Sequence, residues 1–228
     1  MNRVELQRLT LKQDLFPKTI ADRTRKVYDR LSFVYPASTF FFHSKAHKCV
    51  IEDADITNGS KVLEVATGSG EMFRRLLKQN RDGVTVGVDL SPKMAARTQR
   101  QAQAEFKGTT TYCQAVDARQ LPFRDESYDS VVCCYLLELL SQDDIIAVLA
   151  EFHRVLRHRG HLALVLIGEN TEFFNAMYRV AGSVAPAFWG RQVEQSVPAL
   201  IEDLDFRILS DRMVRQGFYP SRVLTAQK

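Results

Sequence analysis

The sequence predicts an α/β protein with a doubly wound sheet of seven mostly parallel strands, an antiparallel hairpin at the C-terminal edge and a helical lid at the N-terminus. From Lys61 onward, apolar strand-like runs alternate with helix-like runs, which is the pattern of parallel strands joined by helices that cover both faces of a sheet. The run from Val62 to Val65 leads into a turn with Gly68 and Gly70, which indicates a strand, a tight turn and a helix. These observations favour one open sheet with a ligand at its glycine turn.

Each predicted element follows from its own local pattern. We expect parallel strands at residues 61–66, 84–89, 110–116, 129–134 and 161–167, and an antiparallel hairpin of 206–214 and 222–226. Ser91 followed by proline predicts a helix over 92–106. Ser141 with Asp144 resembles a capping box and opens a second helix over 142–156.

The length and composition fit one large domain with appendages better than two small domains. The 228 residues are 45% hydrophobic, which is enough to bury a full core. We expect residues 1–57 to form the N-terminal helical lid, which would also serve as a substrate segment, and residues 58–228 to form the core. The strict alternation stops after Gly168, so 170–205 is interpreted as a helical insertion.

Charge and apolar content indicate a cytoplasmic protein that could also associate with a membrane surface. No apolar run approaches the roughly 18–20 residues that span a bilayer, and the N-terminus lacks the apolar core of a signal peptide. Residues 1–48 hold ten Lys/Arg and four Asp/Glu, whereas the remaining residues hold 21 and 23. This N-terminal excess of positive charge indicates either a peripheral membrane contact or a solvated helix face. The four cysteines show no C-x-x-C spacing, so no metal site is predicted.

The glycine turn and two aspartates form the predicted ligand site. A dinucleotide fingerprint would need a third glycine where Phe73 stands, so the G-x-G pattern alone leaves the ligand open. Asp89 ends the second strand beside the turn, where a carboxylate can accept hydrogen bonds from both hydroxyls of a ribose. Asp117 follows the third strand and could accept the exocyclic amine of adenine. An adenosine is therefore the favoured part of the ligand.

Four motifs in this order resemble the class I S-adenosylmethionine-dependent methyltransferases, particularly the ubiquinone and menaquinone biosynthesis C-methyltransferases (methyltransferase type 11). They are VLEVATGSGE, VGVDLSPKM, DARQLPFRDESYDSVVCCYLLELL and EFHRVLRHRG, and the resemblance extends over about residues 25–167. It implies a Rossmann-like fold, S-adenosyl-L-methionine as cofactor and S-adenosyl-L-homocysteine as product. The chain has His158-Arg159-Gly160 where the family commonly has Pro-Gly-Gly, which we interpret as a change in a solvent-facing turn.

The resemblance also implies which residues bind the cofactor. The methionine portion would be met by the end of the first strand and the turn: Glu64, Ala66, Thr67, Gly68 and Gly70. Asp89 would hold the ribose. The adenine would be bordered by a third set: Leu90, Met94, Asp117 and Ala118. The fourth strand would deliver two further residues to the same rim, Cys134 and Tyr135. The N-terminal Tyr28 and Tyr35 would approach the cofactor or the substrate, and a packing role suits them equally well.

Methyl transfer, as the resemblance implies it, needs no nucleophile on the enzyme. The protein has to hold an acceptor in line with the methyl group and exclude water, which can supply several kcal/mol of the barrier. A general base could assist the loss of a proton from the acceptor, and the candidates are His43, His47 and His153. A surface or packing role is the favoured interpretation of each, so no catalytic residue is assigned.

The favoured acceptor is lipid-like or a small molecule, with a quinone precursor or a phospholipid headgroup ahead of the others. The chain lacks the Asn/Asp-Pro-Pro-aromatic motif after the fourth strand, which disfavours a nucleic-acid substrate. Residues 217–222, GFYPSR, resemble the end segment of several lipid-directed members. A soluble secondary metabolite is the next alternative. A nicotinamide-dependent oxidoreductase and a non-catalytic cofactor-binding protein are alternatives of other classes, and the oligomeric state stays open.

Overall fold

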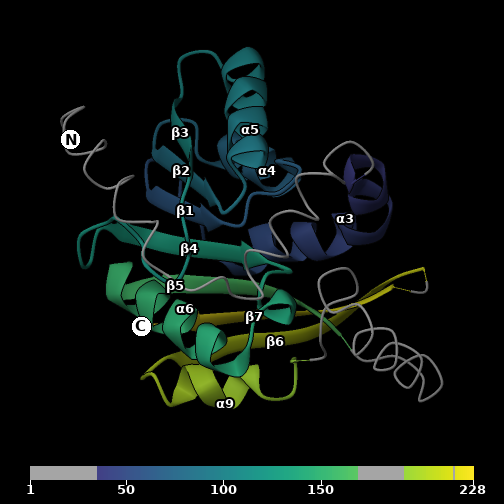
Figure 1. Cartoon of the computed structure of the whole chain (residues 1–228), viewed down its shortest axis with the longest axis vertical. Helices are drawn as coiled ribbons and strands as arrows, with labels where there is room; N and C mark the ends of the chain where they lie inside the picture. The colour runs from purple at the N-terminus through teal and green to yellow at the C-terminus, as the bar shows by residue number, and fades with distance from the viewer. Residues whose placement is uncertain (1–34, 169–192, 218) are drawn as a thin grey trace.

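A seven-stranded sheet forms the centre of the protein in the computed structural model, which describes residues 35–168, 193–217 and 219–228 (Figure 1). The strand order is β3-β2-β1-β4-β5-β7-β6. Neighbouring strands from β3 to β5 run parallel, while β7 runs antiparallel to both β5 and β6. The strands are β1 (Lys61–Val65), β2 (Val84–Asp89), β3 (Thr110–Ala115), β4 (Tyr128–Cys134), β5 (Leu156–Ile167), β6 (Arg207–Gln216) and β7 (Tyr219–Gln227). The predicted fold class and the C-terminal hairpin are confirmed.

The described ranges contain five α-helices and one short 3-10 helix, two of which begin at the caps that the sequence predicts. They are α3 (Tyr35–Asp53), α4 (Glu71–Gln79), α5 (Pro92–Glu105), the short 3-10 helix η2 (Leu137–Leu139), α6 (Gln142–Val155) and α9 (Val197–Glu202). Ser91 Oγ accepts from the backbone N–H of Met94 at 3.3 Å, which caps α5. Ser141 Oγ accepts from the Asp144 N–H at 3.2 Å and donates to the Asp144 carboxylate at 2.8 Å. Both predicted helix starts are therefore confirmed.

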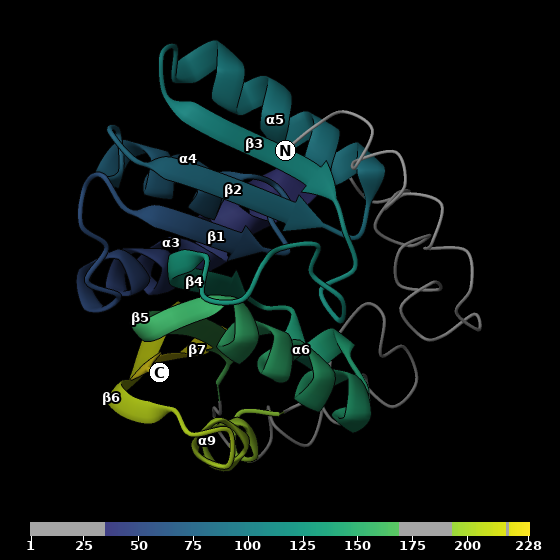
Figure 2. The same cartoon turned by 90° about the vertical axis from the view of Figure 1, so that its left-hand side faces the viewer.

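Helices cover both faces of the sheet, because buried side chains alternate between the faces along each strand (Figures 1 and 2). The face under α3 and α4 holds one cluster: Ala46, Val50, Val62, Met72, Leu76, Val132, Ala163, Val165 and Val223. The face under α6 and α9 holds another, which includes Leu63, Val65, Val131, Cys133, Val148, Phe152, Leu164, Ile201 and Leu224. Helix α5 joins α4 through Phe73, Leu77, Ala102 and Phe106. Each large side chain buried in this way contributes about 1.5–3 kcal/mol.

Strand β5 begins at Leu156, earlier than the sequence predicts, because the chain pairs with β4 as soon as α6 ends. Leu156 lies opposite Tyr128, and pairing resumes with His161 opposite Ser130. Residues 157–160 therefore bulge out of the strand, and the first three of them are exposed. His158, Arg159 and Gly160, which replace Pro-Gly-Gly, lie in this bulge, and the side chains of His158 and Arg159 are exposed to solvent.

The two predicted appendages lie partly outside the described residues. Of the expected lid at 1–57, residues 1–34 lie outside, and α3 packs against α4, β5, β6 and β7. Of the expected insertion at 170–205, residues up to 192 lie outside, and the remainder contains α9. The lid and the insertion stay predictions. None of the helices in the described ranges is long and apolar enough to cross a membrane.

Candidate functional site

The candidate site lies at the carboxyl ends of β1, β2 and β4, where the order of the strands reverses. From β1 the chain steps outward to β2 and β3, and it then returns to place β4 on the other side of β1. At such a switch point the connecting loops diverge and leave room for a ligand. The glycine turn, residues 66–70, directly follows β1 at this point.

The glycine turn folds back onto the end of β2. Ala66 and Thr67 donate backbone hydrogen bonds to the carbonyl oxygen of Val88 at 2.8 and 3.2 Å. The φ angles of Ala66, Gly68 and Gly70 are 63°, 49° and 82°. Glycine adopts this left-handed conformation freely, whereas it costs alanine about 1–2 kcal/mol. Such strain in a non-glycine residue persists where the surrounding structure requires it, and it concentrates at functional sites.

Asp89, the last residue of β2, ties the glycine turn to the start of α5. Its Oδ2 accepts from the backbone N–H of Gly68 at 2.8 Å, and its Oδ1 accepts from the backbone N–H of Ser91 at 2.9 Å. A carboxylate has about four lone-pair sites, so it can accept from several donors at once. The same carboxylate can therefore shape the turn and accept hydroxyl groups of a ligand.

Glu64, near the end of β1, is a buried carboxyl group beneath the turn. The residue is 1% exposed, and its Oε2 has no hydrogen-bond partner among the described residues. Burial, and secondly the negative charge of Asp89, raise the pKa of Glu64 well above its ordinary value. An ammonium group at this place would pair with the carboxylate, which fits the amine of an amino-acid ligand.

A pocket opens beside the turn between the strand ends and α6. It is lined by Val65, Ala66, Val88, Asp89, Leu90, Val116, Asp117, Ala118, Arg119, Leu136, Leu140 and Val148. Five of these belong to the predicted site: Ala66, Asp89, Leu90, Asp117 and Ala118. Sequence reasoning did not assign the other seven to the site: Arg119, Leu136, Leu140, Val148, Val65, Val88 and Val116. The first three of these lie inside the third motif, which could have identified them, whereas Val148 lines the pocket only because α6 packs there.

Asp117 lines the pocket, and its carboxylate is already paired with Arg119. Arg119 Nη2 lies 2.6 Å from Asp117 Oδ2, and its Nη1 lies 3.0 Å from Asp144 Oδ1 at the start of α6. The backbone N–H of Arg119 also donates to Asp117 Oδ1 at 3.0 Å. Arg119 thus holds the Asp117 carboxylate in one orientation, and an adenine amine would share that carboxylate with the guanidinium.

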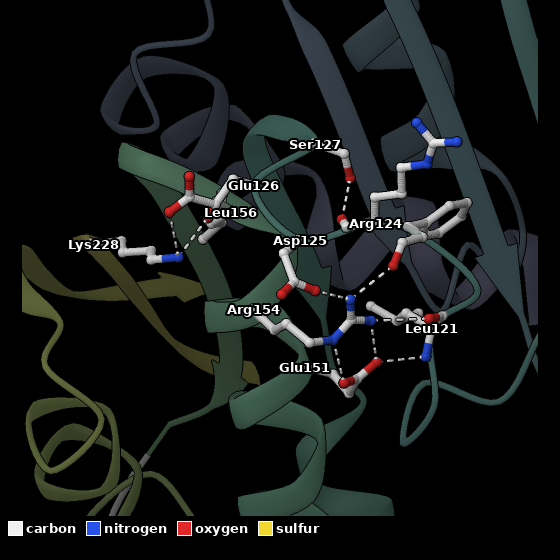
Figure 3. A network of polar contacts seen from close by, with 10 residues as sticks. Leu121, Arg124, Asp125, Glu126, Ser127, Glu151, Arg154, Leu156 and Lys228 are labelled. Carbon is white, nitrogen blue, oxygen red and sulfur yellow. Dashed lines mark hydrogen bonds and ion pairs between the residues drawn. The ribbon is translucent and has the colours of Figure 1, made fainter.

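Arg154 of α6 fixes the loop between β3 and β4, which forms one wall of the pocket (Figure 3). Its guanidinium donates to the carbonyl oxygens of Leu121 and Phe123 at 3.0 and 2.7 Å. It also pairs with the carboxylates of Asp125 and Glu151, both at 2.7 Å. Glu151 in turn accepts from the backbone N–H of Leu121 at 2.7 Å. Arg154 therefore satisfies two backbone carbonyl groups of the loop, and its partner Glu151 satisfies a backbone N–H group.

Thr67 and Met94, also predicted to bind the cofactor, are buried beside the pocket rather than within its lining. Thr67 Oγ1 lies 3.6 Å from Cys113 Sγ. The close approach of Thr67 to β2 depends on Gly87, because a Cβ there would lie 2.7 Å from Thr67 Cγ2. Met94 is 1% exposed within α5. Tyr28 lies outside the described residues, and the side chain of Tyr35, at the start of α3, is likewise not described.

Cys134 and Tyr135 pack against the α3 and α4 face of the sheet, outside the pocket lining. Tyr135 follows β4 with a φ of 56°, which is again a left-handed conformation in a non-glycine residue. Its hydroxyl oxygen lies 2.7 Å from Ser221 Oγ on β7. Burial raises the pKa of the Cys134 thiol well above its ordinary value, so this thiol stays protonated and is a poor nucleophile.

Two of the candidate histidines, His47 and His153, lie apart from the pocket lining. His153, on α6, packs edge-on against Phe206 with ring centroids 5.1 Å apart. Burial, and then the charge of Lys228, lower the pKa of His153, which suits a neutral packing residue. His47 is buried on α3, and its ring centroid lies 6.3 Å from that of Tyr135. The side chain of His43 lies outside those that the structure describes.

Glu138, in η2, should make the stability of the protein depend on pH. Its Oε1 accepts from the Ile167 N–H at 2.6 Å, while burial raises its pKa from 4.5 to about 7. The folded protein therefore retains a proton that the unfolded chain loses, and the free energy of unfolding should fall by about 3 kcal/mol as the pH rises from 4.5 to 7. Glu138→Gln should remove this part of the slope in urea titrations at several pH values. If the free energy of unfolding depended on pH equally in the wild type and the variant, Glu138 would not be the group responsible.

Comparison with known proteins places this site in a family. Residues 62–160 match a family model described as a methyltransferase domain. The chain is 32% identical over 155 residues to a demethylmenaquinone methyltransferase of Thermotoga maritima, and the alignment covers 67% of this chain and 62% of that protein. It is 33% identical over 107 residues to a phosphatidylethanolamine N-methyltransferase of Cereibacter sphaeroides, and this alignment covers 47% of this chain and 50% of that protein. The chain thus spans about half to three fifths of these relatives.

Solved structures share the fold. One is the magnesium protoporphyrin IX methyltransferase of Synechocystis with bound S-adenosylhomocysteine, with a TM-score of 0.62 and 23% identity over 81% of this chain and 80% of that one. The matched domain contains the glycine turn, both aspartates and Arg154. The domain model, the curated relatives and the ordered motifs agree on the same segment, so residues 62–160 form a methyltransferase domain similar to the class I S-adenosylmethionine-dependent methyltransferases.

Proposed function

We propose that the protein transfers the methyl group of S-adenosylmethionine to a lipid-like or small-molecule acceptor, with a quinone precursor or a phospholipid headgroup favoured. The observation that carries the proposal is the pocket at the switch point, where the carboxylates of Asp89 and Asp117 border an otherwise largely apolar lining. An adenosine has a flat ring that suits apolar walls, and it has donors at both ends for the two carboxylates.

The residues of the site fit each part of this cofactor. Asp89 would accept the ribose hydroxyls, and Asp117 would accept the adenine amine beside Arg119. Glu64 has a buried oxygen without a partner among the described residues, and it would attract the ammonium group from beneath the glycine turn. When bound, the cofactor supplies a methyl group activated by a sulfonium, which passes to the acceptor as the acceptor gives up a proton. The chain's own task is then to orient the acceptor and exclude water.

Support for a lipid-like acceptor comes from the relatives. One relative is named for demethylmenaquinone and another for phosphatidylethanolamine, and both of these molecules carry long apolar chains. An enzyme for such an acceptor has to meet it at a membrane surface. The basic N-terminal segment, residues 1–48, supplies the charge for that contact in an otherwise cytoplasmic protein.

Transfer of label from methyl-labelled S-adenosylmethionine tests the function directly. Incubation with a cell extract should place the label in the lipid fraction, and mass spectrometry would then identify the product. Recovery of the label only in water-soluble products would favour the secondary-metabolite alternative. Binding of the cofactor without transfer to any fraction would favour a non-catalytic cofactor-binding protein.

A nicotinamide-dependent oxidoreductase makes a different prediction for thermal stability. Phe73 replaces the third glycine of the dinucleotide fingerprint and is fully buried between α4 and α5. S-adenosylhomocysteine should therefore raise the melting temperature and NADH should leave it unchanged. The reverse result would support the oxidoreductase.

Membrane contact is tested by flotation with vesicles. The full chain should float with vesicles that contain anionic phosphatidylglycerol, and a chain that lacks residues 1–34 should not. Binding should weaken as salt is raised, because screening reduces the attraction between basic side chains and anionic lipid. Equal flotation with neutral vesicles, or no flotation with either kind of vesicle, would indicate that the N-terminal segment serves only as a lid.

A further inference from the structure

Arg119 lies between two acidic side chains, one in the lining of the pocket and one on α6. Its Nε donates to Asp117 Oδ1 and Oδ2 at 3.1 and 3.2 Å, and its Nη2 donates to Asp117 Oδ2 at 2.6 Å. Its Nη1 donates to Asp144 Oδ1 at 3.0 Å, in the first turn of α6. We name Asp117, Arg119 and Asp144 the arginine bridge. Asp117 and Arg119 both line the pocket.

The two ends of the arginine bridge are each held by further bonds. At one end, the backbone N–H of Arg119 donates to Asp117 Oδ1 at 3.0 Å. At the other end, Ser141 Oγ donates to Asp144 Oδ2 at 2.8 Å and accepts from the Asp144 N–H at 3.2 Å. The side chains of Asp117, Arg119 and Asp144 are 25%, 20% and 19% exposed, so water and salt screen their charges less than at an open surface. The orientation of the Asp117 carboxylate is thus fixed by its bonds to a side chain that α6 holds.

A carboxylate in a fixed orientation distinguishes between purines by the group at carbon 6. Asp117 accepts from three N–H groups of Arg119, and a carboxylate offers about four lone-pair sites. A 6-amino group is a donor and can add to these three. A 6-oxo group is an acceptor and would meet the carboxylate oxygen with no hydrogen between them. A site that hydrogen-bonds one group of a substrate rejects an analogue without that donor far more strongly than apolar walls can.

Resting on the proposed function, we propose that Arg119 is the specificity-determining residue for the purine of the cofactor: by holding Asp117 in place, it makes the pocket accept a 6-amino purine and reject a 6-oxo purine. Because Arg119 acts through Asp117, it is a positioning residue. Asp144 holds the opposite side of the guanidinium. Lysine cannot replace it, since an ammonium lacks the planar fork that pairs with one carboxylate while it reaches a second.

The test compares S-adenosylhomocysteine with S-inosylhomocysteine, in which a 6-oxo group replaces the 6-amino group, by isothermal titration calorimetry of the full chain. The wild type should bind the adenosyl ligand at least about a hundredfold more tightly. Arg119→Ala should lower this ratio about tenfold, mainly through weaker binding of the adenosyl ligand, and Arg119→Lys should restore little of it. Asp144→Asn should lower the ratio about threefold, because it weakens the bridge from the side of α6. Arg124→Ala, at an exposed arginine of the same loop (Figure 3), is the matched control and should leave the ratio unchanged.

The ratio separates positioning from a merely structural role, because both ligands are titrated into the same folded protein and a loss of stability affects both alike. An Arg119→Ala ratio equal to that of the wild type would overturn the proposal. A higher ratio would also overturn it, since the guanidinium itself would then favour the 6-oxo group. Full recovery in Arg119→Lys would show that charge alone suffices. Equal binding of both ligands by the wild type would reject this proposal and leave the proposed function intact, whereas binding of neither would reject the proposed function as well.

Discussion

Asp89→Ala should greatly weaken cofactor binding while the protein stays folded. The carboxylate would accept the ribose hydroxyls, and bonds to a charged acceptor are worth about 1.5–3 kcal/mol each. It also holds the backbone N–H groups of Gly68 and Ser91, so its removal would loosen the turn beneath the ligand. We expect affinity for S-adenosylhomocysteine to fall by at least about a hundredfold.

Thermal unfolding with and without S-adenosylhomocysteine measures this loss. At a concentration one hundred times the wild-type dissociation constant, the ligand should stabilise the wild type by about 2.7 kcal/mol and a variant with hundredfold weaker binding by about 0.4 kcal/mol. Asp82→Ala is the matched control, since this exposed aspartate precedes the other end of β2. A variant at position 89 that retained the wild-type shift would remove Asp89 from the cofactor site.

Asn80→Ala should cause a large loss of stability without touching the site. Asn80 is 1% exposed at the end of α4, and its side chain joins the starts of β1 and β2. Oδ1 accepts from the Gly59 and Ser60 N–H groups at 2.9 and 3.1 Å, and Nδ2 donates to Ser60 O and Thr85 Oγ1 at 2.9 and 3.3 Å. Truncation would leave buried polar groups without partners, so we expect a loss of about 3 kcal/mol.

Urea titration and calorimetry would measure this loss, which corresponds to a fall of roughly 6–12 °C in melting temperature for a protein of this size. Asn58→Ala is the control, because Asn58 makes exposed bonds to Asp82 in the neighbouring loop and its loss should cost less than about 0.5 kcal/mol. Folded Asn80→Ala protein should still bind S-adenosylhomocysteine, since Asn80 lies at the opposite end of the sheet. Equal stability of the two variants would contradict the role of Asn80.

Local sequence patterns predicted the elements well because their causes are local. Ser91 and Ser141 cap helices through bonds to residues three positions on, and these spacings can be read directly. Strand β5 shows the limit of such reading. Its start at Leu156 depends on pairing with Tyr128, 28 residues earlier, and no local pattern in EFHRVLRHRG reports a partner on another strand.

The candidate site likewise has one part that local sequence patterns predict and another part that they do not. Ala66, Asp89, Leu90, Asp117 and Ala118 directly follow strands or end them, so strand ends in the sequence were enough to bring them to one pocket. Asp117 is paired with Arg119, and the same guanidinium also pairs with Asp144 of α6, 25 residues further along the chain. No local pattern in the sequence predicts this second pairing. The roles of the individual residues in cofactor binding stay predictions that the variants above can test.

The sequence by itself determined the resemblance to a methyltransferase domain, the strand, turn and helix around Gly68, and the two carboxylates that favour an adenosine. Each of these depends on residues within a few positions of one another. Only the tertiary structure decided that Val148 lines the pocket, that Arg154 holds its wall and that Tyr135 meets Ser221 across 86 residues. Those facts depend on which elements pack together and on the φ angle of a single residue, and long-range packing of that kind leaves no periodic trace in the chain.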